Sequence, residues 1–155
     1  MLFEKDGGRQ MSQPPGVNVP LMPSLEDPKG RGGVLGSKVL VIDDSEDILV
    51  SSAHFLRKAG YDVTLASSGN EGLGKFRPGV FSVVVCDMKM PDINGDQVVK
   101  AIKGQDPSQK VILYTTDAPL LTPEVRVRIG ADVYLEKDLP TVLVEAVQSL
   151  EKLRF

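Results

Sequence analysis

The sequence predicts an α/β domain in which helices cover both faces of a five-stranded parallel sheet. From residue 38 onward, short apolar runs alternate with segments of helical spacing. Runs this apolar are typical of strands that crossover helices bury on both faces. Because parallel strands are joined by right-handed crossovers, the alternation favours one doubly wound sheet.

The expected strands are five apolar runs of four to six residues, each bounded by polar or turn residues. They are KVLVID (38–43), DVTLA (62–66), SVVVCD (82–87), KVILYT (110–115) and DVYLE (132–136). Five strand and helix units in one small domain place all strand carboxyl ends at one edge of the sheet. Ligands of such sheets bind at that edge.

The segments between the strands have the spacing of helices. They are 45–59, roughly 70–76, 95–103, 123–129 and 140–153. The last is the clearest, because Leu143, Leu150 and Leu153 belong to one apolar stripe that is expected to cover the sheet. The second is expected to be short, since Gly72 and Gly74 each cost about 1 kcal/mol relative to alanine inside a helix.

Composition limits the class of protein. A chain of 155 residues holds one well-buried domain and is too short for two ordinary ones. The net charge of -3 offers no positive field for nucleic acid or an anionic membrane. The single cysteine, Cys86, cannot form an internal disulfide, and no stretch of eighteen apolar residues exists. We expect a cytoplasmic protein without nucleic-acid binding or membrane insertion.

Residues 1–37 are expected to form a flexible leader outside the domain, which spans 38–155. The leader is crowded with Gly and Pro and holds neither a helical nor a strand period. It cannot bury enough apolar surface to offset its ordering entropy. Met11 could be an internal start, and the ten residues before it could derive from an upstream start or from an expression tag.

Acidic residues gather at the ends of two expected strands. Asp43 and Asp44 end the first strand, and Asp87 ends the third. Three carboxylates this close are costly unless a cation or protons intervene. Oxygen donors suit Mg²⁺, with Mn²⁺ as a laboratory substitute, whereas Zn²⁺ prefers imidazole or thiolate. The pattern predicts a magnesium site.

Each acidic motif alone also fits simple helix capping. Asp44 or Ser45 could cap the first helix, and Asp96 could cap the third. Two further side chains favour a functional site, because Thr115 ends the fourth strand and Lys137 follows the fifth. A hydroxyl and an ammonium group thus reach the same rim as the carboxylates.

Four motifs resemble the receiver domains of bacterial two-component response regulators, including the chemotaxis regulators. They are VLVIDDSEDI, VVVCDMKMPDINGDQVV, VILYTT and GADVYLEKD, in the order and at the spacings of that family, and the resemblance covers about 38–155. It implies a flavodoxin-like fold with strand order 2-1-3-4-5. It also implies that the leader lies outside the domain.

The resemblance implies a role for each residue of the rim. Asp87 matches the phospho-acceptor, and Asp43, Asp44 and the backbone carbonyl of Lys89 match the other protein groups of the metal site. These assignments follow from the motifs of the family and not from spacing alone.

Three more residues match the motifs. Thr115 matches the hydroxyl that meets the phosphoryl group, Lys137 matches the lysine of the site, and Tyr134 matches a switch aromatic. An ordinary half-buried strand tyrosine is the alternative for Tyr134. The family usually has proline where this chain has Asp138, which puts in doubt a cis peptide after Lys137. Thr116 also replaces a small residue.

The implied activity is phosphorelay signalling, not turnover of an external substrate. Asp87 would take a phosphoryl group from a sensor histidine kinase or a histidine phosphotransfer protein. A face formed by the fourth helix, fifth strand and fifth helix would then bind a downstream protein. We expect a single-domain regulator. An ion pair between Lys89 and Asp117 is further expected to hinder water and lengthen the phosphorylated state.

Other functions remain open at this point. A nucleotide or flavin site needs a phosphate-cradling loop after the first strand, but Asp43–Asp47 is acidic. An aspartate-nucleophile phosphatase needs a second aspartate where this chain has Lys89. A pseudo-receiver that only binds proteins is the remaining alternative. His54 is expected to be an ordinary helix residue, and Cys86 a small core residue.

Overall fold

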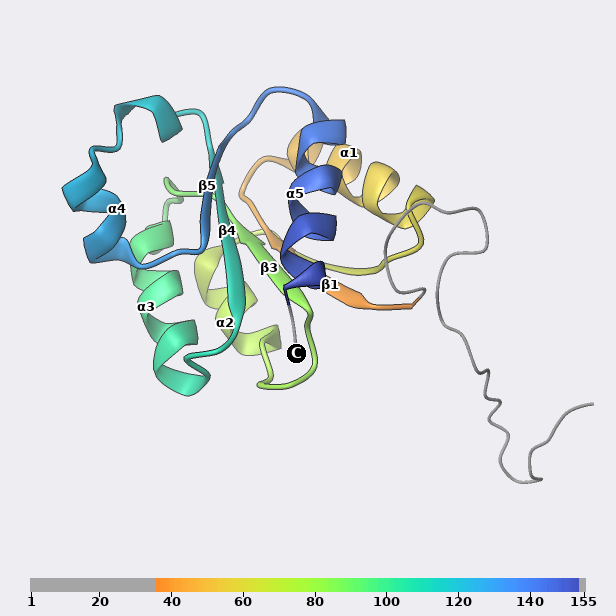
Figure 1. Cartoon of the computed structure of the whole chain (residues 1–155), viewed down its shortest axis with the longest axis horizontal. Coiled ribbons are helices and arrows are strands. Elements are labelled where there is room, and N and C mark those ends of the chain that lie inside the picture. The colour runs from red at the N-terminus through yellow and green to blue at the C-terminus, as the bar shows by residue number, and fades with distance from the viewer. Residues whose placement is uncertain (1–35, 154–155) are drawn as a thin grey trace, which may run out of the picture.

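The computed structural model describes residues 36–153, which form a five-stranded parallel sheet with helices on both faces (Figure 1). The strand order is β2-β1-β3-β4-β5, as expected. The predicted leader, 1–37, and the alternative start at Met11 lie outside the described residues apart from Gly36 and Ser37. Within 36–153, no helix is both long and apolar enough to cross a membrane.

The elements follow the predicted segments closely. The strands are β1 (Lys38–Ile42), β2 (Asp62–Ala66), β3 (Val83–Cys86), β4 (Lys110–Thr115) and β5 (Val133–Glu136). The helices are α1 (Glu46–Lys58), α2 (Gly69–Lys75), α3 (Gly95–Gln105), α4 (Pro123–Ile129) and α5 (Pro140–Lys152). A short 3₁₀ helix, η1 (Ala118–Leu120), was not predicted.

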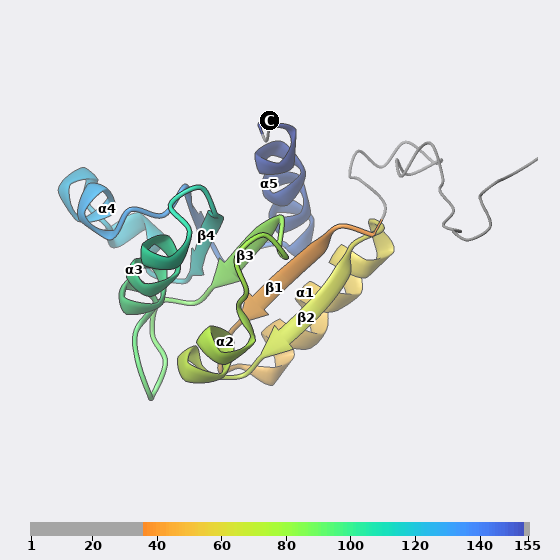
Figure 2. The same ribbon diagram turned by 90° about the horizontal axis from the view of Figure 1, so that it is seen from below.

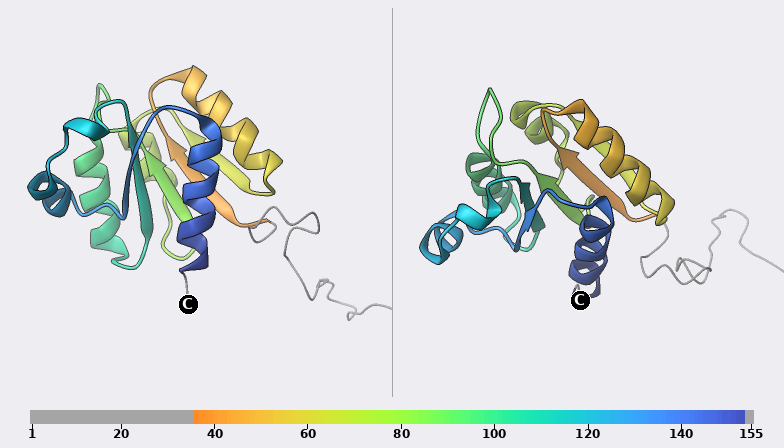
Figure 3. Two further views of the ribbon diagram at one scale, coloured as in Figure 1. Left: turned by 45° about the horizontal axis from the view of Figure 1, so that its top comes forward. Right: turned by 90° about the horizontal axis from the view of Figure 1, so that it is seen from above.

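The sheet separates two hydrophobic clusters. Residues of β1 alternate between them, because successive side chains of a strand point to opposite faces: Val39 and Val41 pack under α1 and α5, whereas Leu40 and Ile42 pack under α2 and α3. Figure 2 shows α1 and α5 on one side of the sheet and α2 and α3 on the other. Figure 3 shows α4 beside α3, at the far end of the molecule from α1.

The helix starts confirm the capping alternative for Ser45 and contradict the one for Asp96. Ser45 caps α1, and its Oγ accepts a hydrogen bond from the Ile48 N–H at 3.4 Å. Asn94, not Asp96, is the N-cap of α3, and its N–H donates to Gln97 Oε1 at 3.0 Å. The cap prediction for Asp96 is wrong because the helix begins at Gly95. Neither cap uses Asp44, whose carboxylate therefore stays available to the rim.

Helix α2 is short, as predicted, but its glycines have a packing role. A Cβ on Gly72 would lie 2.4 Å from Ile42 Cδ1, and one on Gly69 would lie 2.5 Å from Ile93 Cγ1. Gly74 has nothing within 4 Å of its Cβ position. Gly72 therefore lets α2 approach β1 closely, Gly69 lets it approach the segment before α3, and Gly74 has no such constraint.

The apolar stripe of α5 is confirmed except at its end. Leu143, Val147 and Leu150 are buried, whereas Leu153 is 58% exposed. The prediction for Leu153 is wrong because α5 ends at Lys152, and the residue after it no longer follows the direction of the helical stripe.

Candidate functional site

The carboxylates of Asp43 and Asp87 are held side by side by the parallel ladder. Ile42 of β1 pairs with Cys86 of β3, so the residues that follow them leave the sheet together. The Asp87 N–H donates to the Ile42 carbonyl at 2.9 Å, and the Asp43 N–H donates to the Ala66 carbonyl at 3.0 Å. Both aspartates are buried in consequence.

Asp44 completes an acidic cluster with these two residues. Each of the three offers a carboxylate oxygen, and these oxygens all lie within 4.8 Å of one another. Asp43 Oδ1 accepts from the Ser45 N–H at 2.9 Å, and Asp87 Oδ1 accepts from the Met88 N–H at 2.8 Å. Backbone donors orient the buried pair, while Asp44 is exposed to solvent.

Lys137 joins the cluster from the loop after β5, which lies along the upper edge of the sheet in Figure 1. Its Nζ lies 2.7 Å from Asp43 Oδ2 and 3.2 Å from Asp87 Oδ1. The side chain is only 11% exposed. Burial lowers the pKa of this ammonium group, but its hydrogen bonds and attraction to the two carboxylates outweigh burial and raise it.

The charge balance of the cluster is nevertheless unfavourable for Asp87. Burial of its carboxyl and repulsion by Asp43 raise the pKa of Asp87, against the attraction of Lys137. An additional cation would therefore relieve the pocket. Carboxylate oxygens are hard donors, and neither imidazole nor thiolate belongs to the cluster, so the donor set fits Mg²⁺ better than Zn²⁺.

The fourth strand brings Thr115 to the same edge. Thr115 is 1% exposed, and its Oγ1 accepts from the Asp117 N–H at 3.3 Å. The Lys137 N–H donates to the Thr115 carbonyl at 3.1 Å, which ties the ends of β4 and β5 together. The expected ion pair is confirmed, since Lys89 Nζ lies 2.9 Å from Asp117 Oδ2.

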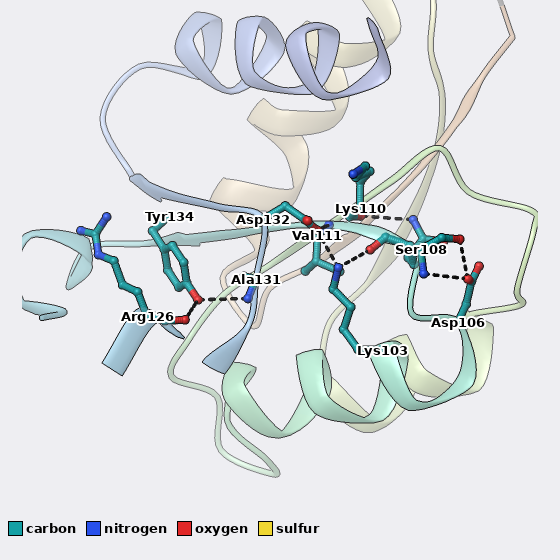
Figure 4. A network of polar contacts seen from close by, with 10 residues as sticks. Lys103, Asp106, Ser108, Lys110, Val111, Arg126, Ala131, Asp132 and Tyr134 are labelled. Atoms are coloured by element: carbon teal, nitrogen blue, oxygen red, sulfur yellow. Dashed lines mark hydrogen bonds and ion pairs between the residues drawn. The ribbon is translucent and has the colours of Figure 1, made fainter. Parts of the chain in front are cut away.

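Tyr134 lies on β5 and is half-buried. Its hydroxyl donates to the backbone carbonyl of Arg126 and accepts from the Ala131 N–H at 3.0 Å, both at the C-terminal end of α4 (Figure 4). The side chain thus faces α4, away from the acidic cluster. Its position is compatible with both roles considered for it.

The remaining sequence candidates are placed as follows. His54 is exposed on α1, and its ring meets the ring of Phe55 edge-on. Cys86 is fully buried, and burial raises the pKa of its thiol, as suits a core residue. The peptides of the described residues are all trans, including the one after Lys137.

Two contacts near the site were not predicted. The Asp92 carboxylate accepts from the N–H groups of Gly69 and Asn70 at 3.2 and 2.7 Å, and these bonds, that of Asn70 foremost, lower the pKa of Asp92. A Cβ on Gly95 would lie 2.3 Å from the Asp87 carbonyl oxygen, so α3 starts directly against the backbone of Asp87. Turn residues were visible in the sequence, but their partners were not.

Comparisons with known proteins agree with this geometry. Residues 39–148 match the profile of the family described as response regulator receiver domain. The chain is similar to the transcriptional regulatory protein PrrA of Mycobacterium tuberculosis, with 33% identity over 121 residues, 78% of this chain and 51% of that protein. It is 35% identical over 101 residues, 65% of this chain, to ZraR of Escherichia coli K12, of which it covers 23%.

Solved structures show the same fold. A CheY-like receiver domain protein from Methanospirillum hungatei superposes with a TM-score of 0.69 and 30% identity, over 76% of this chain and 94% of that one. The chemotaxis regulator CheY4 of Vibrio cholerae gives a TM-score of 0.66 and 32% identity, over 74% and 98%. TrrA of Thermotoga maritima, solved with Mg²⁺ and BeF, gives 0.67 and 30%, over 74% and 98%.

The chain thus spans between about a quarter and a half of the curated relatives that it matches. The family profile covers most of the described domain, and the acidic pocket, the strand order and the sequence motifs agree with it. The chain belongs to the response regulator receiver domain family, which makes it a phospho-accepting domain of two-component signalling and not an enzyme for an external substrate.

Proposed function

We propose that Asp87 accepts a phosphoryl group from the phosphohistidine of a sensor histidine kinase or a histidine phosphotransfer protein. One observation supports this assignment above all: the ammonium group of Lys137 lies between the carboxylates of Asp43 and Asp87 at the rim. Of the three clustered aspartates, Asp87 directly follows the central strand β3, with Thr115 at the end of the neighbouring strand.

The chemistry is an in-line transfer. A carboxylate oxygen of Asp87 attacks phosphorus, the bond from phosphorus to the imidazole nitrogen breaks, and the leaving imidazole keeps the electron pair and takes a proton from solvent. An ionised carboxylate needs no general base. The obstacle is repulsion between two anions, so Lys137 offsets charge on a phosphoryl oxygen and Thr115 donates a hydrogen bond to another.

The metal site would consist of Asp43, Asp44, Asp87 and the backbone carbonyl of Lys89. Mg²⁺ fits this all-oxygen set, and Mn²⁺ is a substitute. When bound, the ion supplies positive charge against the phosphoryl oxygens. The residues of the chain then hold and orient the acceptor, because backbone donors already fix the Asp43 and Asp87 carboxylates.

The output would be a protein contact on the face of α4, β5 and α5. Leu120 of η1, Val127 of α4 and Leu139 at the N-cap of α5 are 78%, 82% and 56% exposed. Apolar side chains this exposed suit a protein partner. Movement of Thr115 and Tyr134 after phosphorylation would alter that face. The cytoplasm is the proposed compartment, and neither nucleic acid nor a membrane is a proposed partner.

The Lys89–Asp117 ion pair is proposed to lengthen the phosphorylated state. The pair crosses the mouth of the site at 2.9 Å, where the Lys89 side chain is 77% exposed. The hydrogen bond and charge of Asp117 raise the pKa of Lys89, which favours the charged form that the pair requires. Its effect on an attacking water is expected to be small, since exposed pairs contribute little.

The deciding experiment is incubation with acetyl phosphate and Mg²⁺, followed by intact-mass analysis. The wild-type chain should gain the mass of one phosphoryl group, and Asp87→Asn should not. Chelation of the metal with EDTA should prevent the gain. If neither protein gains mass, the proposal is refuted. The chain would then be a pseudo-receiver, which binds proteins without phosphorylation.

A further inference from the structure

Arg126 of α4 holds the loop between β4 and α4 with its side chain. Its Nη2 donates to the Ala118 carbonyl at 2.8 Å, and its Nε donates to the Leu121 carbonyl at 3.1 Å. Ala118 is the first residue of η1, and Leu121 is its C-cap. A guanidinium group is planar and carries donors in a fixed fork, so one side chain fixes both ends of this short helix.

Arg126 also contacts Tyr134 in two ways. Its Cζ lies 5.1 Å from the centroid of the Tyr134 ring, within the range of a cation–π interaction. Its backbone carbonyl accepts from the Tyr134 hydroxyl and, at 3.0 Å, from the Gly130 N–H at the end of α4 (Figure 4). The position of Tyr134 is therefore tied to that of Arg126.

The loop that Arg126 holds is also tied to the phosphorylation site. Asp117, directly before Ala118, donates its N–H to Thr115 Oγ1 at 3.3 Å. Ala118 is 4% exposed, so the loop is packed at this point. A shift of the Thr115 hydroxyl toward a group on Asp87 would break this bond or draw Asp117, and with it the packed loop, along.

We propose that Arg126 is a positioning residue that clasps the β4–α4 loop to Tyr134, and that phosphorylation of Asp87 has to open this clasp. The inference rests on the proposed function of Asp87. Contacts that exist only in the clasped arrangement stabilise it against the arrangement in which Thr115 has moved. Arg126 thus sets how readily the site accepts a phosphoryl group, although it does not touch that group.

The expected effect follows from the contacts that are lost. Two hydrogen bonds to carbonyls and one cation–π contact, taken at the low end of their usual strengths, together change a two-state equilibrium by about tenfold or more. Arg126→Ala should therefore bind the phosphoryl analogue beryllofluoride, with Mg²⁺, more tightly than the wild type, by about tenfold or more. Arg128→Ala is the matched control, because Arg128 lies on the same helix and is exposed.

The test measures the half-saturating beryllofluoride concentration by amide NMR shifts for the wild type, Arg126→Ala, Arg126→Lys, Tyr134→Phe and Arg128→Ala. Lysine keeps a cation near the ring but cannot donate as a fork, so Arg126→Lys should lie between the wild type and Arg126→Ala. Tyr134→Phe removes the hydroxyl bond and should also tighten binding. Added to Arg126→Ala, it should tighten binding by less than the product of the two single effects.

Each outcome decides one question. If the wild type fails to bind beryllofluoride and gains no phosphoryl mass, the proposed function is wrong, whatever the variants do. If the wild type binds and Arg126→Ala matches Arg128→Ala, the clasp is refuted even where urea unfolding shows lost stability. If Arg126→Ala does not fold, Arg126→Lys and Tyr134→Phe replace it in the test. Half-saturating beryllofluoride concentrations equal to that of the wild type in both variants would also refute the proposed role of Arg126.

Discussion

The centre of the sheet, at β3, and its edge at β5 are built differently. Strand β3, beside the acidic cluster, is buried along its whole length, whereas β5 is half-buried or exposed throughout. The Asp43 and Asp87 carboxylates are oriented by backbone N–H groups, but the loop after β4 is held by the side chain of Arg126. A well-packed backbone holds reacting groups in fixed positions. Lightly packed segments unfold locally at a lower free energy, so they change conformation more easily. In the proposed function, the place of reaction is thus packed more tightly than the place of response.

The largest effect is expected from replacement of Lys137, which belongs to the well-packed acidic cluster. Lys137→Met removes the charge beside Asp43 and Asp87, and loss of one such preorganised donor slows a transfer by about 100-fold or more. The rate of mass gain with acetyl phosphate measures this effect. Lys103→Met is the matched control, because Lys103 pairs with Asp132 at 2.8 Å near the start of β5, away from the site. Equal rates in the two variants would contradict the role of Lys137.

The packing of α2 on β1 should not tolerate a larger side chain at Gly72. Gly72→Ala places a Cβ 2.4 Å from Ile42 Cδ1 in the core, and such overpacking lowers the free energy of unfolding by about 1 to 3 kcal/mol. Gly74→Ala, on the same helix with open space at its Cβ, should raise it by up to about 1 kcal/mol. Urea unfolding compares the two variants. If Gly72→Ala is more stable than the wild type, the contact between α2 and β1 adapts easily to the added methyl group.

Removal of the Asp87 charge should stabilise the protein without metal. The raised pKa of Asp87 means that the folded state holds the ionised form less well than the unfolded chain. Stability from this group is thus lost as pH rises through its folded pKa, and at pH 7 the charge is destabilising. Asp87→Asn should raise the free energy of unfolding in EDTA by about 1 kcal/mol.

Mg²⁺ should reverse this order, since its proposed binding to the native acidic cluster would stabilise the wild type by mass action. Urea unfolding of both proteins, in EDTA and in excess Mg²⁺, measures the change. If Asp87→Asn is the less stable protein in EDTA, the crowding of negative charge at the rim has been overestimated.

The smallest effect is expected at the mouth of the site. Lys89→Ala breaks the exposed pair with Asp117 and should speed loss of the phosphoryl group by less than about fivefold, because exposed ion pairs contribute little. The decay of the phosphorylated mass after removal of acetyl phosphate gives the rate. Lys100→Ala, an exposed lysine of α3, serves as the control. An unchanged decay in Lys89→Ala would remove the pair from the account.

The sequence was sufficient to predict the helices and strands, which have a periodic pattern, and the residues at which the strands end. Apolar runs located all five strands, and because parallel strands end at one edge, Asp43, Asp87 and Thr115 could be placed on one rim before any coordinates. The short α2 was also foreseen from its glycines, although their reason is contact with Ile42 and not helix propensity alone.

Contacts between a side chain and a distant backbone group escaped prediction. Arg126 bonds the carbonyls of Ala118 and Leu121, and the Asp92 carboxylate bonds N–H groups at the start of α2. Every residue has a carbonyl and almost every residue an N–H, so sequence letters do not identify such partners. The predicted burial of Leu153 was wrong for a related reason. The last residue of a helical pattern has no following turn of helix to fix its direction.

The most direct test of the central claim is to trap the phosphorylated residue chemically. After incubation with acetyl phosphate and Mg²⁺, borohydride reduces an aspartyl phosphate to homoserine, and peptide mass mapping locates the change. The account predicts homoserine at position 87 and at no other aspartate. Homoserine at Asp43 or Asp44, or an unmodified Asp87 in a phosphorylated protein, would contradict it.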